Sequence, residues 1–420
     1  MNSQLTGTDR AHLRGALELA EGGRGRVSPN PLVGAVIVRD GAAIAEGFHA
    51  ELGGLHAERA ALEDCRRRGE DPAGATMYVT LEPCAHQGRQ PPCTEAILEA
   101  GIGRVVIGSD DPSEKASGRG PGILRDGGME VELATGEEAT AARLLNQPFR
   151  KHARTGLPLV TLKLAMSLDG RTTTAPGDSP WISGERSREL VHRWRAESDA
   201  VAVGIGTVLA DDPALTARPD PSGAPYAPIS DIKRTGTVFR QPLRVVFDRQ
   251  VRLPAESQLL RTLDQSAVLV VVSPQAERDR SAALKDAGAE VVIADSVDAA
   301  LAELGRRNVT SLFLEGGTTL AGAFSKAGQI DQARTFVAPI LLGSADSRAG
   351  GVGVGGFPPP EGCGGQDSDP ESDPSLRPEQ RAGQGRPPTP TPGPARLSAL
   401  HSEVETVGED VLITTRFKEW

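Results

Sequence analysis

The sequences HAE at residues 56–58 and PCAHQGRQPPC at residues 83–93 determine the fold expected for the first part of this 420-residue chain. They offer one imidazole, from His56, and two thiolates, from Cys84 and Cys93. Such borderline and soft ligands suit a zinc ion and leave one coordination position open. An open position holds a water molecule, so the pattern indicates a catalytic rather than a structural zinc site. Glu58 follows the histidine by two residues and can carry protons to and from that water.

Short apolar runs around this pattern predict a three-layer α/β domain, to which we assign residues 1–150. A helix is expected to end at Gly22-Gly23, and two apolar runs flank Asp40-Gly41, which is typical of a hairpin turn. The predicted strands are 32–38, 42–48, 76–81, 104–108 and 129–133, and the predicted helices are 12–21, 56–68 and 94–100. This order places the histidine and both cysteines at the starts of two neighbouring helices, where they can face one ion.

Strands and helices alternate in the second domain, to which we assign residues 157–420. The predicted strands are 159–163, 200–203, 243–247, 267–272, 290–293, 311–314 and 411–415, and the predicted helices are 185–197, 276–287 and 297–304. This alternation predicts a mainly parallel sheet that is covered on both faces. Residues 344–396 are rich in Gly, Pro, Ser, Asp and Gln and poor in aromatic residues, so we expect a disordered internal loop there.

Composition restricts the classes of partner and of compartment. A net charge of −10 argues against a nucleic-acid partner and against an acidic membrane surface. The longest apolar run, at 267–272, is too short to span a bilayer, and residues 1–10 lack the apolar core of a signal peptide. Four cysteines in so long a chain do not form a disulfide framework. Because the zinc ligands must be thiolates, we expect a reducing cytoplasm.

The first domain resembles a family with a specific chemistry. H-x-E followed by P-C is similar to the signature of zinc-dependent deaminases of nucleobase-like rings, but the insert between the two cysteines is longer than the common P-C-x-x-C. With SPNPLVGAV at 28–36 and LEPCAH at 81–86, it resembles the deaminase half of the bifunctional deaminase–reductases of riboflavin biosynthesis.

The second domain resembles the reductase half of the same family. The similar segments are KLAMSLDGR at 163–171, Trp181-Ile182, GTVLADDPALT at 206–216 and LEGG at 314–317. The likeness covers nearly the whole chain outside residues 344–396. It implies a cytidine-deaminase-like first domain and a dihydrofolate-reductase-like second domain.

The resemblance also implies two consecutive reactions on one small phosphoribosyl-pyrimidine substrate. The first domain, with Zn²⁺, would deaminate 2,5-diamino-6-(5-phosphoribosylamino)pyrimidin-4(3H)-one. The second domain would use NADPH to reduce the ribosyl group, giving 5-amino-6-(5-phosphoribitylamino)uracil. Related enzymes are commonly oligomeric, so a homo-oligomer is compatible with the resemblance, although the sequence does not give its size.

The family's deaminase substrate contacts correspond to five polar residues here: Asn30, His49, His86, Arg89 and Asp111. The guanidinium and the imidazoles can meet a phosphate, and the amide can read the edge of a ring. Two positions depart from the family pattern. Ser113 stands where the family usually has Asn, and Gln90 stands where it often has Thr.

The reductase cofactor site lacks a full dinucleotide fingerprint, because Gly204-Ile205-Gly206 has no third glycine at the required spacing. Glu315-Gly316-Gly317 between a strand and a helix is either an ordinary turn or an anion-binding turn. The resemblance favours the second interpretation. It implies NADPH contacts at Ala165, Trp181, Thr207, Asp211, Gly317, Thr318 and Thr319.

Substrate contacts of the reductase follow from the same resemblance. They correspond to Lys163, Ser179, Arg195, Leu215, Arg218 and Glu315. Two arginines suit a phosphate, although single arginines are more often solvated surface charges. Lys163 and Asp211 are candidates for polar assistance to hydride transfer. Arg249 replaces a small hydroxyl residue at one cofactor position of the family.

Two other functions remain open at this point. A nucleic-acid deaminase with an unrelated second domain would need a basic face and stacking aromatics, whereas this chain is acidic and has only 3% aromatic residues. A non-catalytic scaffold that binds zinc or a nucleotide would not require Glu58. The departures at Ser113 and Arg249 keep the scaffold in consideration for one of the domains.

Overall fold

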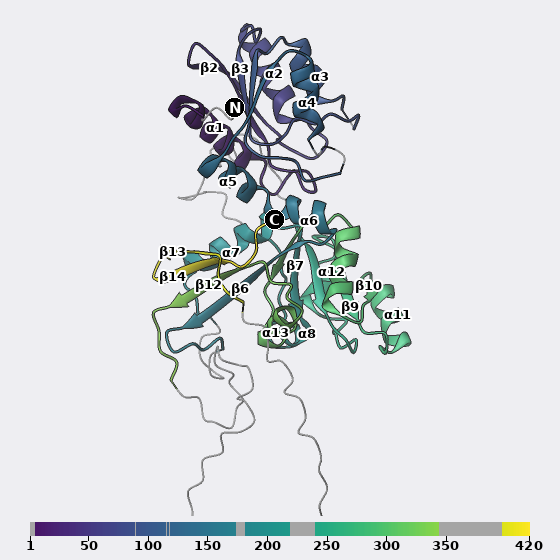
Figure 1. Ribbon diagram of the computed structural model, residues 1–420. Coiled ribbons are helices and arrows are strands. Elements are labelled where there is room, and N and C mark those ends of the chain that lie inside the picture. Colours follow the sequence, from purple (N-terminus) through teal and green to yellow (C-terminus); the bar gives the residue numbers. More distant parts are fainter. Residues whose placement is uncertain are drawn as a thin grey trace, which may run out of the picture.

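In this computed structural model, the described residues are 5–88, 90–114, 116, 118–173, 181–218, 240–343 and 397–420. They form two α/β domains, and the α/β class expected from the sequence is confirmed (Figure 1). Arg89, Ser179 and residues 344–396, for which the sequence made predictions, lie outside the described residues.

The first domain contains a five-stranded sheet. Its strands are β1 (Gly34–Arg39), β2 (Ala42–Phe48), β3 (Thr76–Val79), β4 (Arg104–Ile107) and β5 (Glu130–Leu133), in the order β2-β1-β3-β4-β5. Strand β1 is antiparallel to both β2 and β3, and β3, β4 and β5 are parallel. Every strand except β1 therefore runs in one direction, and their carboxyl ends share one edge of the sheet.

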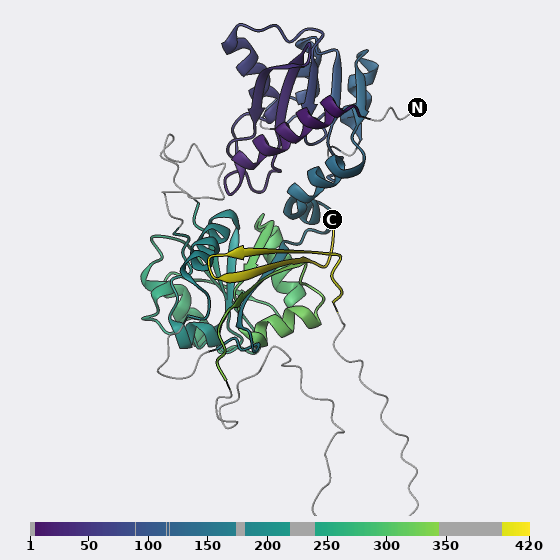
Figure 2. The ribbon, with the colours of Figure 1, turned by 90° about the vertical axis from the view of Figure 1, so that its left-hand side faces the viewer.

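Helices cover both faces of this sheet. They are α1 (Gly7–Ala20), α2 (Ala57–Arg68), α3 (Cys93–Glu99), α4 (Arg119–Asp126) and α5 (Gly136–Leu145), with a short 3₁₀ turn at Glu21–Gly23 after α1. Ala61 of α2, Ile97 of α3 and Leu124 of α4 pack into one core, whereas Leu13 of α1 packs into a core on the other face. The expected three layers are present (Figure 2).

The predicted hairpin between β1 and β2 is confirmed. Asp40 and Gly41 both have positive φ angles, of 53° and 80°. Two consecutive residues in this region define the turn type that matches the twist of a two-residue hairpin, and Asp-Gly tolerates it at little cost. The sequence did not predict α4, because Gly120, Pro121 and Gly122 are poor helix formers.

The second domain contains a nine-stranded sheet. Its strands are β6 (Leu159–Ser167), β7 (Ala200–Gly204), β8 (Leu243–Phe247), β9 (Val268–Val272), β10 (Glu290–Ile293), β11 (Ser311–Leu314), β12 (Gln332–Ala338), β13 (His401–Val407) and β14 (Asp410–Arg416). The order is β10-β9-β8-β7-β11-β6-β12-β14-β13. The strands from β10 through β12 in this order pair in parallel, and β14 pairs antiparallel with both β12 and β13.

Helices pack on both faces of the second sheet, as expected for a parallel sheet. They are α7 (Glu185–Glu197), α8 (Ile205–Asp211), α10 (Gln258–Arg261), α11 (Arg278–Asp286), α12 (Val297–Arg306) and α13 (Thr318–Lys326). Trp194 of α7 and Leu284 of α11 belong to one core, and Leu301 of α12 and Phe324 of α13 belong to the core on the opposite face. In the described part of the chain, no helix is long and apolar enough to cross a membrane.

Helix α6 (Gln147–Thr155) lies between the two domains and bonds to both (Figure 1). The guanidinium of Arg150 donates to the backbone oxygens of Asp110 and Trp420, at 2.8 Å and 2.7 Å. Lys151 forms a fully buried ion pair with Asp331, with an Nζ–Oδ2 distance of 2.6 Å. Buried charges of this kind are costly unless paired, so these contacts fix the helix against the second domain.

Asp9 anchors α1 to the sheet of the first domain. Its Oδ1 accepts hydrogen bonds from the hydroxyl of Tyr78 on β3 and from the guanidinium of Arg104 on β4, both at 2.7 Å. Its Oδ2 accepts from the backbone and side chain of Thr6, the N-cap of α1. Burial alone would raise the pKa of Asp9, but the hydrogen bonds from Arg104, Thr6 and Tyr78 outweigh it and hold this pKa well below its usual value.

We predict that Asp9→Asn lowers the free energy of unfolding of the first domain by about 1–3 kcal/mol at pH 7, because charge-assisted hydrogen bonds are lost. A carboxylate whose pKa is lowered by folding stabilises above its unfolded pKa of about 3.9, and this contribution is lost as pH falls. The difference between wild type and variant should therefore shrink from pH 5 to pH 3. Urea denaturation followed by circular dichroism measures it.

The matched control is Asp126→Asn, which removes an exposed carboxylate at the end of α4. It should leave the free energy of unfolding nearly unchanged. An Asp9→Asn penalty that stays constant across this pH range would contradict the assigned role of the carboxylate.

Candidate functional site

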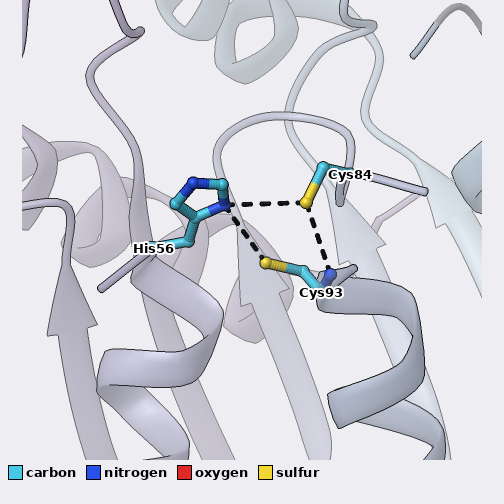
Figure 3. Close-up of side chains that lie close together, drawn as sticks. All are labelled: His56, Cys84 and Cys93. Atoms are coloured by element: carbon cyan, nitrogen blue, oxygen red, sulfur yellow. Dashed lines mark hydrogen bonds between the residues drawn. The ribbon is translucent and has the colours of Figure 1, made fainter. Parts of the chain in front are cut away.

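The loops that follow β2 and β3 bring the predicted zinc ligands together (Figure 3). His56 is the N-cap of α2 and Cys93 is the first residue of α3, while Cys84 lies in the loop between β3 and α3. The Nδ1 atom of His56 lies 3.6 Å from the Sγ of Cys84 and 3.4 Å from the Sγ of Cys93. The predicted placement at two neighbouring helix starts is confirmed for His56 and Cys93, but it was wrong for Cys84, which the long insert places in the loop before α3.

The spacing of these three atoms fits a zinc ion. Tetrahedral zinc, with Zn–S bonds near 2.3 Å and Zn–N bonds near 2.0 Å, requires N···S separations of about 3.5 Å. The measured separations match this value, and all three ligand atoms lie within 4.8 Å of one another. A His and two Cys leave a fourth position for water or substrate, as in catalytic zinc sites.

The two thiols share their protons unequally. The hydrogen bond from Cys93 lowers the pKa of Cys84 to about 4, and the bond to His56 acts in the same direction. The same hydrogen bond with Cys84, together with burial, raises the pKa of Cys93. A cation held between the two sulfurs favours both thiolates, so loading of the site releases the proton of Cys93.

Glu58 lies in the first turn of α2, on the side of the ligands. Its side chain is buried, with 4% of its surface exposed. Burial raises the pKa of this carboxyl, and the negative charge of Cys84 raises it further. A carboxyl group with a raised pKa can both accept and return a proton near neutral pH.

Asn30 and His49 form a pair beside the zinc ligands. The Nδ1 of His49 donates to the carbonyl of Leu55 at 2.9 Å, so Nε2 is left to accept from the amide of Asn30 at 3.1 Å. The ring centroids of His49 and His56 are 5.5 Å apart. Burial lowers the pKa of His49, and the neighbouring His56 adds to this effect. The structure therefore gives a neutral, oriented imidazole at the edge of the site.

His86 and Asp111 lie close enough for the imidazole to lower the pKa of the carboxyl, although burial outweighs this and raises it. Among the described residues, the Nδ1 of His86 is buried without a hydrogen-bond partner, so it is available to a ligand. The backbone amide of Ser113 donates to Asp111 at 2.8 Å, which holds this carboxylate in a turn. The fifth predicted contact, Arg89, lies outside the described residues.

Three residues to which the sequence assigned no function hold the loops of this site. Gln90 donates to the carbonyl of Gly54 at 2.6 Å, and Arg59 donates to that of Pro92 at 2.9 Å. The carboxylate of Glu82 is buried and accepts the backbone amides of Gly118 and Gly120, at 3.1 Å and 3.2 Å. The sequence signals for Glu82 are its acidic side chain directly before Pro83 and its position within the LEPCAH segment.

A second group of charged residues lies at the carboxyl end of β11, beside the middle of β6. The guanidinium of Arg195 on α7 forms two hydrogen bonds with the carboxylate of Glu315, at 2.6 Å and 2.9 Å. Burial lowers the pKa of the Lys163 ammonium, although the nearby Glu315 partly opposes this. The structure thus brings together three of the predicted reductase residues.

The loop after α8 closes one side of this group. The carbonyl of Thr216 accepts hydrogen bonds from Arg195 at 3.2 Å and from His192 at 3.3 Å. Burial lowers the pKa of His192, and Arg195 and Arg218 lower it further, so Arg218 lies nearby. Leu215 has a positive φ of 54°, and its side chain is buried in the hydrophobic core. Ser179 lies outside the described residues.

The start of α13 presents free backbone groups beside the start of α8. Gly317 is the N-cap of α13 and Gly204 is the N-cap of α8, and neither helix has a side-chain cap. A Cβ placed on Gly317 would meet only the hydroxyl of Thr207, at 3.9 Å. Thr318 and Thr319 are exposed in the first turn of α13. The uncapped N–H groups of two adjacent helices form a cradle that suits a pyrophosphate.

The remaining predicted cofactor residues are spread more widely. Trp181 is 62% exposed, with the Arg188 guanidinium 5.1 Å from its ring centroid, and Ala165 lies on β6. Asp211 is exposed at the last residue of α8, at the end opposite the cradle. Arg249 is exposed in the loop after β8. A bound dinucleotide is long enough to reach several of these positions, whereas a phosphate alone is not.

Comparisons with known proteins agree with both domains. Residues 6–109 match the cytidine and deoxycytidylate deaminase zinc-binding region, and residues 158–356 match the RibD C-terminal domain. Riboflavin biosynthesis protein RibD of Actinobacillus pleuropneumoniae is 39% identical, over 84% of this chain and 90% of that protein. RibD of Escherichia coli K12 is also 39% identical, over 80% of this chain and 89% of that protein.

Solved structures show the same likeness over both domains. RibD of Acinetobacter baumannii has a TM-score of 0.74 and 34% sequence identity, covering 98% of this chain and 99% of that one. A diaminohydroxyphosphoribosylaminopyrimidine deaminase/5-amino-6-(5-phosphoribosylamino)uracil reductase of Thermotoga maritima has a TM-score of 0.73 and 32% identity, with the same coverage.

We predict that the purified chain binds about one zinc ion at the His56, Cys84 and Cys93 site. Cys84→Ser and Cys93→Ser should each lose most of the metal, because a hydroxyl replaces a thiolate ligand. Elemental analysis of the dialysed proteins measures this. Cys65→Ala is the matched control, because Cys65 is a free, buried core residue outside the cluster. Full zinc occupancy in Cys93→Ser would show that the ligand set is wrong.

Proposed function

This chain belongs to the RibD family of bifunctional deaminase–reductases of riboflavin biosynthesis, and we propose that it carries out two consecutive steps on one phosphoribosyl-pyrimidine. The first step is hydrolytic deamination of 2,5-diamino-6-(5-phosphoribosylamino)pyrimidin-4(3H)-one. The second is NADPH-dependent reduction of the ribosyl group to give 5-amino-6-(5-phosphoribitylamino)uracil. The observation that carries the first step is the three-ligand cluster with the buried Glu58 beside it.

We assign the deaminase to residues 1–150 and the reductase to residues 157–420. Helix α6 spans Gln147–Thr155 and connects the two, which supports a boundary there. The need for two thiolate ligands supports a reducing cytoplasm as the setting. A small-molecule substrate requires no nucleic-acid partner and no membrane.

Glu58 is the proposed proton carrier of the deaminase. When bound to His56, Cys84 and Cys93, zinc supplies the Lewis acidity that lowers the pKa of a water to about 7. Glu58 accepts one proton of the attacking water and delivers it to the ring nitrogen. It then transfers the second proton, from the hydroxyl group of the adduct, to the amino group, which leaves as ammonia. Burial of Glu58 raises the pKa of the carboxyl, which supports this double role.

The proposed substrate contacts of the deaminase have complementary chemistry. The neutral His49 and the amide of Asn30 offer directed hydrogen bonds to the pyrimidine edge. The unpartnered Nδ1 of His86 and the carboxylate of Asp111 lie on the side of the inter-cysteine loop. We propose that Arg89, with these two residues, meets the phosphoribosyl group.

NADPH fits the second domain at the cradle formed by the starts of α8 and α13. Thr207, Gly317, Thr318 and Thr319 would hold its phosphates, with Ala165, Trp181 and Asp211 along the rest of the molecule. NADPH supplies the hydride that reduces the sugar carbonyl. Lys163 lies near Glu315 and carries a lowered pKa, so it is suited to donate the proton that the reduced oxygen needs. We propose that Arg195, Arg218, Leu215, Ser179 and Glu315 contact the phosphoribosyl group.

We expect the wild-type protein to release ammonia from the pyrimidine substrate and then to oxidise NADPH. Glu58→Gln should retain zinc but lose ammonia release by about a hundredfold or more, because positioned acid–base catalysis contributes 10²–10⁴. A coupled ammonia assay, with metal analysis of the same preparation, measures both.

If the wild type produces neither ammonia nor oxidised NADPH, the proposed function is refuted, and a scaffold becomes the better interpretation. Ammonia release without NADPH oxidation would remove the assignment of the second domain. A fully active Glu58→Gln protein would refute the proton-carrier role alone.

We further predict that Gly317→Val weakens NADPH binding by about tenfold or more. The added side chain occupies the space in front of the backbone N–H groups. The variant protein should still fold, because the surroundings of Gly317 have room for a side chain. Fluorescence titration with NADPH measures the change in Kd. Gly322→Ala is the matched control, because Gly322 lies in the same helix with open space around it. Equal affinities of the two variants would place the cofactor elsewhere.

A further inference from the structure

The turn that carries Asn30 also touches the second domain. The backbone amide of Asn30 donates to the carbonyl of Val27 at 2.9 Å, which closes a four-residue turn over residues 27–30. The side chain of Asn30 bonds to His49 in the deaminase site. Ser28, two residues earlier in the same turn, donates from its hydroxyl to the Oδ2 of Asp199 at 2.7 Å. One short turn therefore joins the deaminase site to a carboxylate of the reductase domain.

Asp199 is fixed within its own domain. It lies between α7 and β7, has 7% of its surface exposed, and accepts the backbone amide and the hydroxyl of Thr310 at 2.8 Å and 2.7 Å. Its backbone amide donates to the hydroxyl of Ser311 at 2.9 Å. A buried carboxylate with this many donors has one orientation, so it is a rigid reference point for Ser28.

The backbones of the two domains also approach closely at this place. Gly25 has a φ of 75°, and a Cβ there would lie 2.8 Å from the carbonyl oxygen of Ala196 at the end of α7. Only glycine allows this approach. The half-buried Arg24 binds Glu21. Although burial opposes it, the charges of Glu21 and of Glu197 on α7 raise the pKa of the Arg24 guanidinium, so Arg24 and Glu197 lie near one another. Arg24, Gly25 and Ser28 thus all lie against the end of α7 and the residues that follow it.

We propose that Asp199 of the reductase domain is a positioning residue for the deaminase site. Through Ser28 it fixes the turn at residues 27–30, and so it directs the amide of Asn30 toward His49 and the pyrimidine. The same helix α7 holds Arg195 in the reductase site, four residues before Asp199. The deaminase site is therefore complete only when the second domain is docked. This inference rests on the proposed role of Asn30 in substrate binding.

The test is Ser28→Ala in the full-length, zinc-loaded enzyme. This change removes the hydroxyl that contacts Asp199 and, at 3.1 Å, Thr310 of the second domain, and it leaves the bonds of Asp199 within that domain. We expect the KM for deamination to rise about threefold to tenfold, the effect of one lost hydrogen bond. The kcat for ammonia release, the zinc content and the kcat for NADPH oxidation should stay within twofold. Ser28→Thr keeps the hydroxyl and should restore the KM.

Ser311→Ala is the matched control. It removes a partner of Asp199 inside the reductase domain without touching residues 27–30. Its KM for deamination should stay within twofold of wild type. An equal rise in this control, or a fall in both activities of Ser28→Ala together, would mean that the contact only stabilises the fold, and the proposal would be wrong.

Hydrogen exchange separates this inference from the proposed function. The backbone N–H of Asn30, which closes the turn, should exchange faster in Ser28→Ala than in wild type. This holds whether or not the protein acts on the pyrimidine. If the wild type releases no ammonia, the proposed function fails while the exchange still tests the contact. If the wild type is active and Ser28→Ala alters neither the KM nor the exchange, the positioning role of Asp199 is refuted.

Discussion

Both sites depend on one constraint, which is the direction of hydrogen-bonded strands. Parallel strands place their carboxyl ends, and the helix starts that follow them, at one edge of a sheet. In the first domain this edge collects His49 after β2, Cys84 after β3 and Asp111 after β4. In the second domain it collects the starts of α8 and α13 after the neighbouring strands β7 and β11. The chemistry differs, but the geometry that gathers the residues is the same.

The two sites use this edge in different ways. The first uses side chains, since two thiols and an imidazole must lie at metal-bonding separations, and loop contacts such as Gln90 to Gly54 hold them there. The proposed cofactor site uses mostly backbone, since the uncapped N–H groups at the starts of α8 and α13 could bind a pyrophosphate without any particular side chain. This explains why the zinc set could be predicted from a short motif, whereas Glu315-Gly316-Gly317 alone was equally compatible with an ordinary turn.

Apolar patterns along the chain predicted most of the helices and strands. Strands and side chains that pair with residues far away in the sequence could not be predicted in this way. Helix α7 and strands β8, β10 and β11 begin and end where the apolar patterns indicated. Strands β12 and β13 were not predicted, because their alternation is weak and β12 pairs with β14, about eighty residues later in the sequence. Arg195 and Glu315 were each expected to bind substrate, yet a sequence does not show that they bind each other across 120 residues. The contact between Ser28 and Asp199 is hidden for the same reason.

Strand β14 lies in the interior of the second sheet, between β12 and β13, although it is formed by residues 410–416. During synthesis on the ribosome, β12 consequently has an unpaired edge until these residues emerge. The first domain has its five strands complete long before that moment. Translation thus orders the two folding events in time, and the interval between them is the period in which the half-built sheet is exposed to other chains in the cell.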